Sequence, residues 1–285
     1  MASDTPIVLI GDRAEVAPRP RGATAKLRPG RFALTVAALF TFAFLYVPIA
    51  VLIAFSFNSA RTGATWQGFT LQWYERMLSN PRLIDAAANS LIVAALSTLG
   101  SVVIGTLMAI AMERYRFRAQ AVWDGLLYMP VIVPEIVMGI SLLLFFASIG
   151  LERGLITLII SHIAFSMPFV YLTMRARLAD FDRSLEEAAQ DLGADEWTTF
   201  RRVTFPLLLP GIISSALLAF TLSLDDFVTS FFVAGVGSQT LPVYIWGQIR
   251  RGITPEINAI STVMLILSIV LVILSQALQR RQSSH

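Results

Sequence analysis

The chain has 285 residues, of which 55% are hydrophobic and only 14% are charged, and it contains no cysteine. This composition is far from that of a soluble domain, and the lack of cysteine excludes disulfides and thiolate metal sites. The net charge is +3 at pH 7. We interpret this excess as a signal of membrane topology rather than of nucleic-acid binding, so no nucleic-acid partner is expected.

Six apolar stretches are long enough to cross a membrane. A hydrocarbon core about 30 Å thick requires roughly 20 residues of helix. The stretches cover approximately residues 32–57, 86–112, 125–149, 155–174, 207–233 and 257–279. Glu135, Asp225 and Asp226 are the charged residues inside them. The sequence therefore predicts an all-α, multi-pass membrane protein with six transmembrane helices that contact lipid.

The distribution of Lys and Arg predicts the orientation, because cytoplasmic loops retain these residues. The two tails and the loops at 113–122 and 175–206 carry sixteen of them, against six on the opposite side. We therefore expect both termini to be cytoplasmic.

Residues 1–31 contain prolines and scattered arginines but no apolar run long enough for a cleavable signal peptide, so we expect a poorly ordered cytoplasmic tail. The segment 32–85 holds the first span and an external part rich in aromatic residues. These are Trp66, Phe69, Trp73 and Tyr74. Such residues are typical of the headgroup level of a membrane, and recognition of a partner is the alternative.

The second and third spans differ in character. The second has small residues at every fourth position, which lets helix backbones approach closely in lipid and predicts packing inside a bundle. These residues are Ser97, Ser101, Gly105 and Ala109. The third is interrupted by Pro130 and Pro134 just before Glu135. Irregular backbone at membrane depth occurs where protein or a water-filled cavity surrounds it, so Glu135 is a candidate functional residue.

The fourth span contains His162 without a nearby ligand in the sequence. We interpret this histidine as an interhelical hydrogen bonder. In the fifth span, Asp225 and Asp226 are adjacent, and neighbouring helical residues diverge by about 100°. One carboxylate can therefore face a central cavity while the other pairs with backbone or a neighbouring helix. Two partly solvated acids near a helix end are the alternative.

The loop at 175–206, between the fourth and fifth spans, has the pattern of a helix, a glycine and a second helix. Ser184 followed by Glu187 has capping-box spacing and predicts a helix beginning at Ser184. Glu186 and Glu187 then lie in its first turn, where negative charge complements the helix dipole. An apolar stripe follows at helical spacing. It consists of Leu185, Ala188, Ala189 and Leu192.

Gly193 is placed to end this first helix in a left-handed cap. Asp195 is placed to cap a second helix, which carries Trp197 and which we expect to end near Pro206. A short helix with small residues on one face can insert closely into a groove of another protein. An amphipathic helix lying on the membrane surface is the alternative, and the spacing alone does not separate the two.

The order Glu187-Ala188-Ala189, Gly193, Val203, Phe205 and Pro206 resembles the "EAA" loop of binding-protein-dependent ABC importer permeases. The usual pattern has Ile and Leu where this chain has Val203 and Phe205, and both replacements stay apolar. The resemblance implies a type I permease core at roughly 86–277, with a coupling loop at about 180–206 and a short tail at 278–285. In that family the loop fits a cleft on the ATP-binding subunit. The implied coupling residues are Glu186, Glu187, Ala188, Ala189, Leu192, Gly193 and Pro206.

Further motifs are similar to the second permease subunit of spermidine/putrescine transporters. They are Thr221 to Phe227, Leu241-Pro242, Gly252 to Asn258, and Met129-Pro130 with Pro134-Glu135, where the acid is commonly Asp. The resemblance implies a polyamine, whose ammonium groups need compensating negative charge in a low-dielectric pore. The implied substrate-pathway residues are Glu135, Asp225 and Asp226.

The resemblance also implies partners in a bacterial inner (plasma) membrane. The chain lacks a Gly-x-x-x-x-Gly-Lys-[Ser/Thr] phosphate loop. ATP hydrolysis would thus belong to a separate dimer of ATP-binding subunits, and this chain would have no catalytic residue, metal or cofactor. A second homologous permease subunit, forming a heterodimer, and a periplasmic or extracellular substrate-binding protein would complete the importer.

Three alternatives remain in view. Permeases for other small solutes share the loop pattern. A proton-coupled secondary transporter could use His162, Glu135 and the Asp pair as a relay, but it does not explain the capped cytoplasmic helix, and no inverted repeat is apparent. An intramembrane enzyme would rest on Ser161-His162, whose adjacent side chains diverge too far to activate a nucleophile.

Overall fold

The computed structural model describes residues 29–60, 65–116, 118–250 and 255–282. The expected N-terminal tail up to residue 28 and part of the Gly252 to Asn258 motif lie outside these ranges. Within them the chain is helical, and the β-type pairing is one isolated bridge between Asn58 and Phe69. Residues 1–50 and 51–285 form two separate compact units.

The first unit contains most of helix α1 (Pro29–Phe55), which continues into the second. Residues 33–55 are apolar enough to cross a membrane. Their side chains up to residue 50 are exposed or partly exposed, as expected of a helix that meets lipid rather than water.

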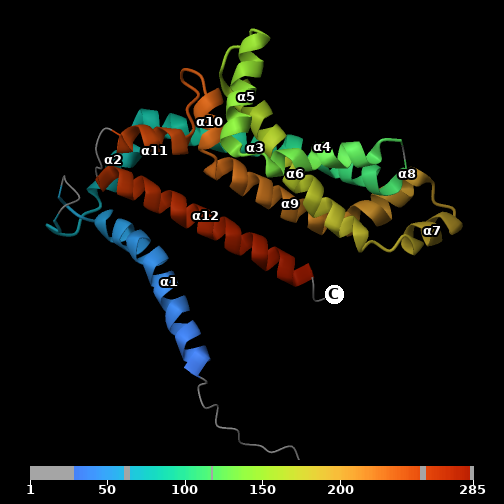
Figure 1. The fold of residues 1–285 in the computed structure, drawn as a ribbon, viewed down its shortest axis with the longest axis horizontal. Helices are drawn as coiled ribbons and strands as arrows, with labels where there is room; N and C mark the ends of the chain where they lie inside the picture. The colour runs from blue at the N-terminus through green and yellow to red at the C-terminus, as the bar shows by residue number, and fades with distance from the viewer. Residues whose placement is uncertain (1–28, 61–64, 117, 251–254, 283–285) are drawn as a thin grey trace, which may run out of the picture. The chain divides into compact units, whose positions relative to one another are not determined.

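The second unit is a bundle of membrane-length helices with shorter helices at both ends (Figure 1). Its elements are α2 (Gln72–Leu78), α3 (Pro81–Arg114), α4 (Gln120–Ile132), α5 (Glu135–Ser148), α6 (Leu155–Ala179), α7 (Ser184–Asp191), α8 (Glu196–Thr199), the π-helical turn η1 (Phe200–Thr204), α9 (Phe205–Asp225), α10 (Val228–Val233), α11 (Leu241–Ile249) and α12 (Pro255–Gln282).

Helices α3, α6 and α9 pack on one another and form the centre of the bundle. The predicted small-residue stripe of α3 is buried along its whole length, which confirms its packing role. At Gly105 the backbones come so close that an added Cβ would lie 2.8 Å from Val170 Cγ1 and 3.0 Å from the carbonyl oxygen of Met167, both on α6. Helix α12 packs on α9, and α4 lies against α6.

Five helices of the described residues are long and apolar enough to cross a membrane alone, and a sixth span results if α4 and α5, which meet at a bend of 107°, count as one broken span. The predicted break in the third span is confirmed, but it lies at Val133-Pro134, whereas Pro130 is inside α4. Helix α4 also begins at Gln120, before the predicted boundary. Figure 1 shows α5 projecting away from the layer of α3, α6 and α9.

The prediction of one continuous fifth span over 207–233 is wrong. Helix α9 ends at Asp225, because Asp226 adopts an extended backbone conformation (φ −63°, ψ 122°), and α10 begins two residues later. At the other end, the fifth span begins earlier than the predicted residue 207. Here α8, η1 and α9 form one apolar helix from Glu196 to Asp225.

The aromatic residues before α3 have divided roles. Trp73 is buried, and its indole N–H donates to the carbonyl oxygen of Asn58 at 2.7 Å. Trp66 and Phe69 are exposed. The headgroup interpretation therefore suits Trp66 and Phe69, while Trp73 joins α2 to the residues that follow α1.

Substitution of Gly105 by Ala should destabilise the bundle by about 1–3 kcal/mol, because the new methyl group meets backbone that cannot yield. Gly125→Ala on α4 is the matched control, since an added Cβ there meets nothing within 4 Å. Thermal unfolding of the purified variants in detergent measures both effects. Equal stability of Gly105→Ala and the unsubstituted protein would contradict the close α3–α6 contact.

Candidate functional site

The break between α9 and α10 is organised by the carboxylate of Asp226. Its two oxygens accept the backbone N–H groups of Thr229 at 3.2 Å and Ser230 at 2.8 Å, which lie in the first turn of α10. These N–H groups would otherwise lack partners at the start of a helix. Asp226 therefore caps α10 and stabilises the break in the middle of an apolar segment.

His162 of α6 lies on the other side of this carboxylate. Its Nε2 is 3.3 Å from Asp226 Oδ2 and 3.0 Å from the Ser230 hydroxyl, and its Nδ1 is 2.7 Å from the Ser223 hydroxyl. Both the histidine and the aspartate side chains are fully buried. The prediction that His162 serves as an interhelical hydrogen bonder is confirmed.

The two adjacent aspartates face different surroundings, as predicted from helix geometry. Asp226 is buried against α6, whereas Asp225 is exposed and accepts a hydrogen bond from Ser268 of α12 at 3.3 Å. Glu135, the first residue of α5, is partly buried, and its carboxyl group interacts with that of Asp226. The structure therefore brings Glu135 and Asp226 together at two helix breaks and leaves Asp225 on the α12 side.

Sequence reasoning missed the hydroxyl groups that complete this cluster. Ser223 and Ser230 bond to His162, and Ser223 also bonds to Ser97 of α3 at 3.0 Å. The signal was present in the spacing, because Ser223, Asp226 and Ser230 recur at intervals of three and four residues. Polar residues on one face of a membrane-spanning helix indicate that another helix supplies hydrogen-bond partners for them.

Helix α7 begins at Ser184 as predicted, but the predicted capping box is absent. Ser184 is the first helical residue, and its backbone N–H donates to Asp182 at 3.0 Å, so Asp182 takes the capping role. Hydrogen bonds from Ser184 hold the pKa of the Asp182 carboxyl below its ordinary value. At the other end, Gly193 has φ +88°. The bonds from Gly193 N–H to Gln190 and from Ala194 N–H to Ala189 form the glycine cap that was predicted.

The apolar stripe of α7 points into solvent. Leu185 is 47% and Leu192 is 90% exposed, and none of the helix's residues is buried. Glu187 and Ala188 are exposed beside them. Glu186 differs, because its carboxylate accepts hydrogen bonds from Arg114 of α3 and Thr204 of η1. Three predicted coupling residues, Glu187, Ala188 and Leu192, thus share one exposed region, with Ala189 partly exposed beside them. Glu186 instead faces the body of the protein.

Asp195 caps α8 as predicted, accepting the Thr198 N–H at 3.0 Å. The expectation that this second helix ends near Pro206 is wrong. Phe200 to Thr204 form a π turn, in which Phe205 N–H donates to Phe200, and the helix continues. Pro206 directly follows this π turn, so the residue without an N–H lies where the helical hydrogen-bond pattern is already irregular.

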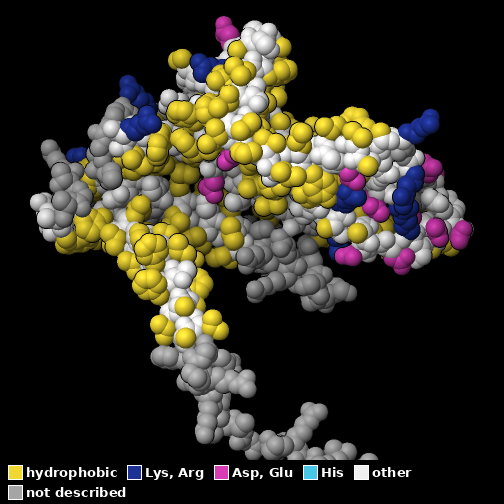
Figure 2. Space-filling view, in the orientation of Figure 1, with side chains coloured by type: hydrophobic (Ala, Val, Ile, Leu, Met, Phe, Trp, Pro, Cys, Tyr) yellow, Lys and Arg dark blue, Asp and Glu magenta, His cyan; other side chains and the backbone are white. Residues whose placement is uncertain are grey.

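Apolar and charged side chains occupy different parts of the second unit. Figure 2 shows apolar side chains over the helices that face the viewer and charged side chains concentrated where α7 and α8 lie. Acidic side chains also appear among the apolar ones near the middle of the view. This pattern is that of membrane-spanning helices with a polar end in water.

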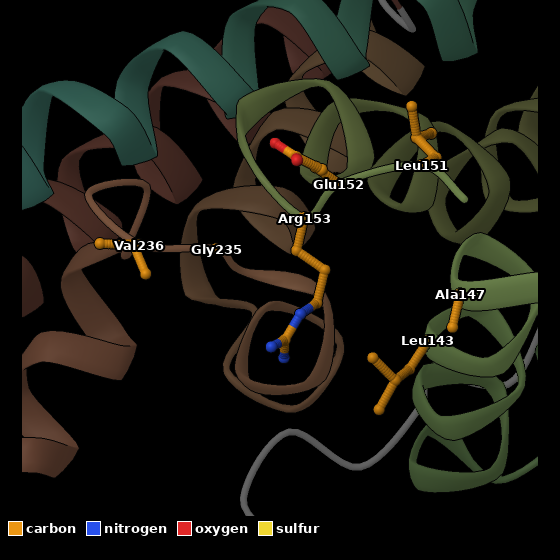
Figure 3. A pocket seen from close by; sticks show the side chains of 7 residues that line it. All are labelled: Leu143, Ala147, Leu151, Glu152, Arg153, Gly235 and Val236. Carbon is orange, nitrogen blue, oxygen red and sulfur yellow. The ribbon is translucent and has the colours of Figure 1, made fainter.

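A pocket of about 330 Å³ lies between the end of α5 and the loop after α10. Figure 3 shows Arg153 extending into it, while Glu152 points in another direction. At Gly235 an added Cβ would lie 1.9 Å from the carbonyl oxygen of Arg153. The two loops therefore touch through their backbones, and the pocket lies apart from the acidic cluster.

Comparison with known proteins agrees with this architecture. Residues 101–284 match the family described as binding-protein-dependent transport system inner membrane component. The chain belongs to this family. It is therefore a permease component of a bacterial inner membrane, as its apolar helices indicate.

The chain is 43% identical over 254 residues to the spermidine/putrescine transport system permease protein PotC of Haemophilus influenzae, covering 89% of this chain and 99% of the relative. It is 45% identical over 239 residues to PotC of Escherichia coli K12, covering 84% and 90%. The putrescine transport system permease protein PotI of Escherichia coli K12 is 38% identical over 237 residues, covering 81% and 84%.

Solved structures confirm the predicted type I ABC importer permease fold. A bacterial ABC transporter that imports alginate matches with a TM-score of 0.69 and 19% identity, covering 88% of this chain and 94% of the other. The methionine transporter MetNI matches with a TM-score of 0.59 and 18% identity, covering 73% and 98%.

Replacing Asp226 by Asn should lower the free energy of unfolding by on the order of 3 kcal/mol, because it breaks a buried pair and leaves His162 without its charged partner. Asp225→Asn is the matched control, since Asp225 is exposed. Thermal unfolding of both variants measures the difference. Equal destabilisation of the two would contradict the assignment of Asp226 as the buried cap.

Proposed function

We propose that this chain is the transmembrane permease subunit of an ATP-driven importer of the polyamines putrescine and spermidine, and that it forms half of the translocation pore. The observation that carries the proposal is the 43–45% identity to spermidine/putrescine permeases over most of both chains. The proposal extends the function for which these relatives are named to this protein.

The acidic cluster supports a polycationic substrate. A polyamine carries at least two ammonium groups, and each requires compensating charge within the membrane. Asp225 is exposed and Glu135 is partly exposed. Asp226 is already engaged by His162 and by the backbone of α10. We therefore assign direct contacts with the substrate to Glu135 and Asp225, and a supporting role to Asp226.

Aromatic rings beside the cluster support the same substrate class. The ring of Phe227 lies 5.5 Å from that of Phe231 and 5.4 Å from that of Trp246. Aromatic faces attract ammonium groups through their electron density. A methylene chain between ammonium groups also suits an apolar wall, so this cluster is a suitable surface for a polyamine in transit.

Helix α7 supports docking to a separate ATPase. Its exposed stripe of Leu185, Ala188 and Leu192 is outside the apolar bundle and has small residues where a partner must approach closely. With both termini in the cytoplasm, as the Lys and Arg distribution favours, α7 is cytoplasmic as well. The assembly we propose contains two ATP-binding subunits, a second homologous permease and an external substrate-binding protein.

An importer for a different small solute is the second candidate. The same fold carries permeases named for alginate and for methionine, so the fold alone does not select a polyamine. A proton-coupled transporter is a third candidate, because His162, Asp226 and Glu135 lie in one cluster.

Uptake of labelled putrescine and spermidine by the reconstituted complex separates these candidates. The complex contains this chain, its partner permease, the ATPase and the binding protein. We expect uptake that requires internal ATP and survives collapse of the proton gradient. ATP hydrolysis without polyamine uptake would indicate another solute, and uptake driven by the gradient would indicate a secondary transporter.

Neutralising Glu135 or Asp225 should reduce polyamine uptake by about tenfold, which corresponds to a loss of roughly 1.4 kcal/mol in the transport step. The variants are Glu135→Gln and Asp225→Asn, and copurification of the subunits should be unchanged. Unchanged uptake in both variants would remove these residues from the substrate pathway.

Reversing the charge of Glu187 should prevent docking of the ATPase, because Glu187 is exposed on α7 beside the apolar stripe. We expect Glu187→Lys to lose ATP-dependent uptake and to copurify with less ATPase, while ATP hydrolysis by the isolated ATPase stays normal. Glu75→Lys on α2, an exposed position away from α7, is the charge-matched control. Full activity of Glu187→Lys would contradict docking through this face.

A further inference from the structure

The carboxylate of Glu186 joins three elements of the cytoplasmic end. Its Oε1 atom accepts hydrogen bonds from Arg114 Nη2, in the last turn of α3, and from the Thr204 hydroxyl in η1. The Glu186 side chain is 14% exposed, on a helix that otherwise faces solvent. One oxygen atom thus connects α7 to two separate elements.

A second contact ties the start of α7 to the same end of α3. Arg183 Nη2 donates to the backbone carbonyl of Glu113 at 2.9 Å. This carbonyl is among the last of α3, which lack partners within the helix. Arg183 directly precedes α7. Residues 183 and 186 therefore both bind the last turn of α3.

The element on the other side of Glu186 reaches the acidic cluster. Thr204 belongs to the continuous helix from Glu196 to Asp225, which is roughly 45 Å long at 1.5 Å per residue. Its far end is the break where Asp226 caps α10 and pairs with His162. The π turn that contains Thr204 is a type of irregularity that is frequent at functional sites.

We propose that Glu186 is a coupling strut: through Arg114 and Thr204 it transmits a displacement of α7 to α3 and to the 196–225 helix. This role rests on the proposed function, in which an ATPase moves α7. Because both donors share one oxygen, a shift of α7 relative to either helix pulls on a charge-assisted bond, and such bonds are roughly twice as strong as neutral ones. Glu186 is therefore a positioning residue that acts inside this chain, while Glu187 belongs to the surface that meets the partner.

The test uses three variants. Glu186→Gln and Thr204→Val keep side-chain size nearly constant, and Arg114→Gln replaces the charged donor by a shorter neutral one. In the complete reconstituted complex, we expect Glu186→Gln and Arg114→Gln to lower ATP-dependent polyamine uptake by about tenfold, and Thr204→Val by less, since it removes a neutral donor. Copurification of the subunits and their ATP hydrolysis should stay within about twofold, because the docking face is intact. Glu196→Gln, an exposed charge on α8, is the control.

A charge exchange separates the strut from a direct contact with the ATPase. The double variant Glu186→Arg with Arg114→Glu recreates the ion pair in reverse, and Thr204 can accept a hydrogen bond from the new arginine. We expect the double variant to recover most of the uptake that each single reversal loses. A residue that meets the partner would not be rescued by a change in α3.

A readout independent of polyamine keeps this proposal distinct from the proposed function. The chain has no cysteine, so Ile136→Cys on α5, at an exposed position next to Glu135, introduces a single thiol in this chain beside the acidic cluster. Its labelling rate should change with ATP in the otherwise unsubstituted complex and lose that change in Glu186→Gln. An ATP-dependent change without polyamine uptake would contradict the substrate assignment and leave the strut intact.

Three results would contradict the proposal that Glu186 is a coupling strut. The first is wild-type uptake and labelling in Glu186→Gln and Arg114→Gln. The second is loss of ATPase copurification in Glu186→Gln alone, which would assign Glu186 to the docking surface. The third is loss of assembly in all three variants with recovery in the double variant, which would make the contact one that maintains the fold rather than one that couples motion.

Discussion

The backbone's need for hydrogen-bond partners inside a hydrocarbon layer governs this structure. An unsatisfied N–H or C=O group there costs several kcal/mol, so a chain crosses lipid as helix and can break only where other groups supply partners. Asp226 provides such partners for Thr229 and Ser230 at the break between α9 and α10. Its charge in turn requires His162, and His162 requires the hydroxyls of Ser223 and Ser230. The polar cluster is therefore a consequence of the helix break, because the backbone groups exposed by the break need polar partners.

The same helix break brings two carboxyl groups close together. Helix α5 starts after the 107° bend that follows Val133-Pro134, and its first residue, Glu135, interacts with Asp226 across the two breaks. An uninterrupted pair of helices would present apolar side chains at this depth. The bends therefore create a place where a charged solute can be met by carboxylates, and the close packing of α3, α6 and α9 keeps it in position.

Local rules predicted much of this correctly. Apolar length located most of the spans, and the stripe at Ser97 to Ala109 marked a packing face. Gly193 marked the end of the first helix after the fourth span, and Asp195 marked the start of the second. The failures share a cause. The end expected near Pro206 and the continuous span to residue 233 depend on how the chain satisfies its backbone after a proline or an aspartate. That outcome was decided by the π turn and by residues of neighbouring helices, which local spacing does not contain.

The sequence by itself determined that the protein is a helical membrane protein with a glycine-capped helix between two spans, because hydropathy, capping and helical spacing are local properties. The resemblance of its motifs to a known family, and not these local properties, predicted a permease. Only the tertiary structure decided which acidic residues are available. Asp225 and Asp226 are adjacent residues of the same type, yet Asp225 is exposed and Asp226 is buried against His162. Glu186 and Glu187 differ in the same way, since one binds Arg114 and the other faces solvent. The partners that separate them come from helices distant in the chain, and packing alone brings those helices together.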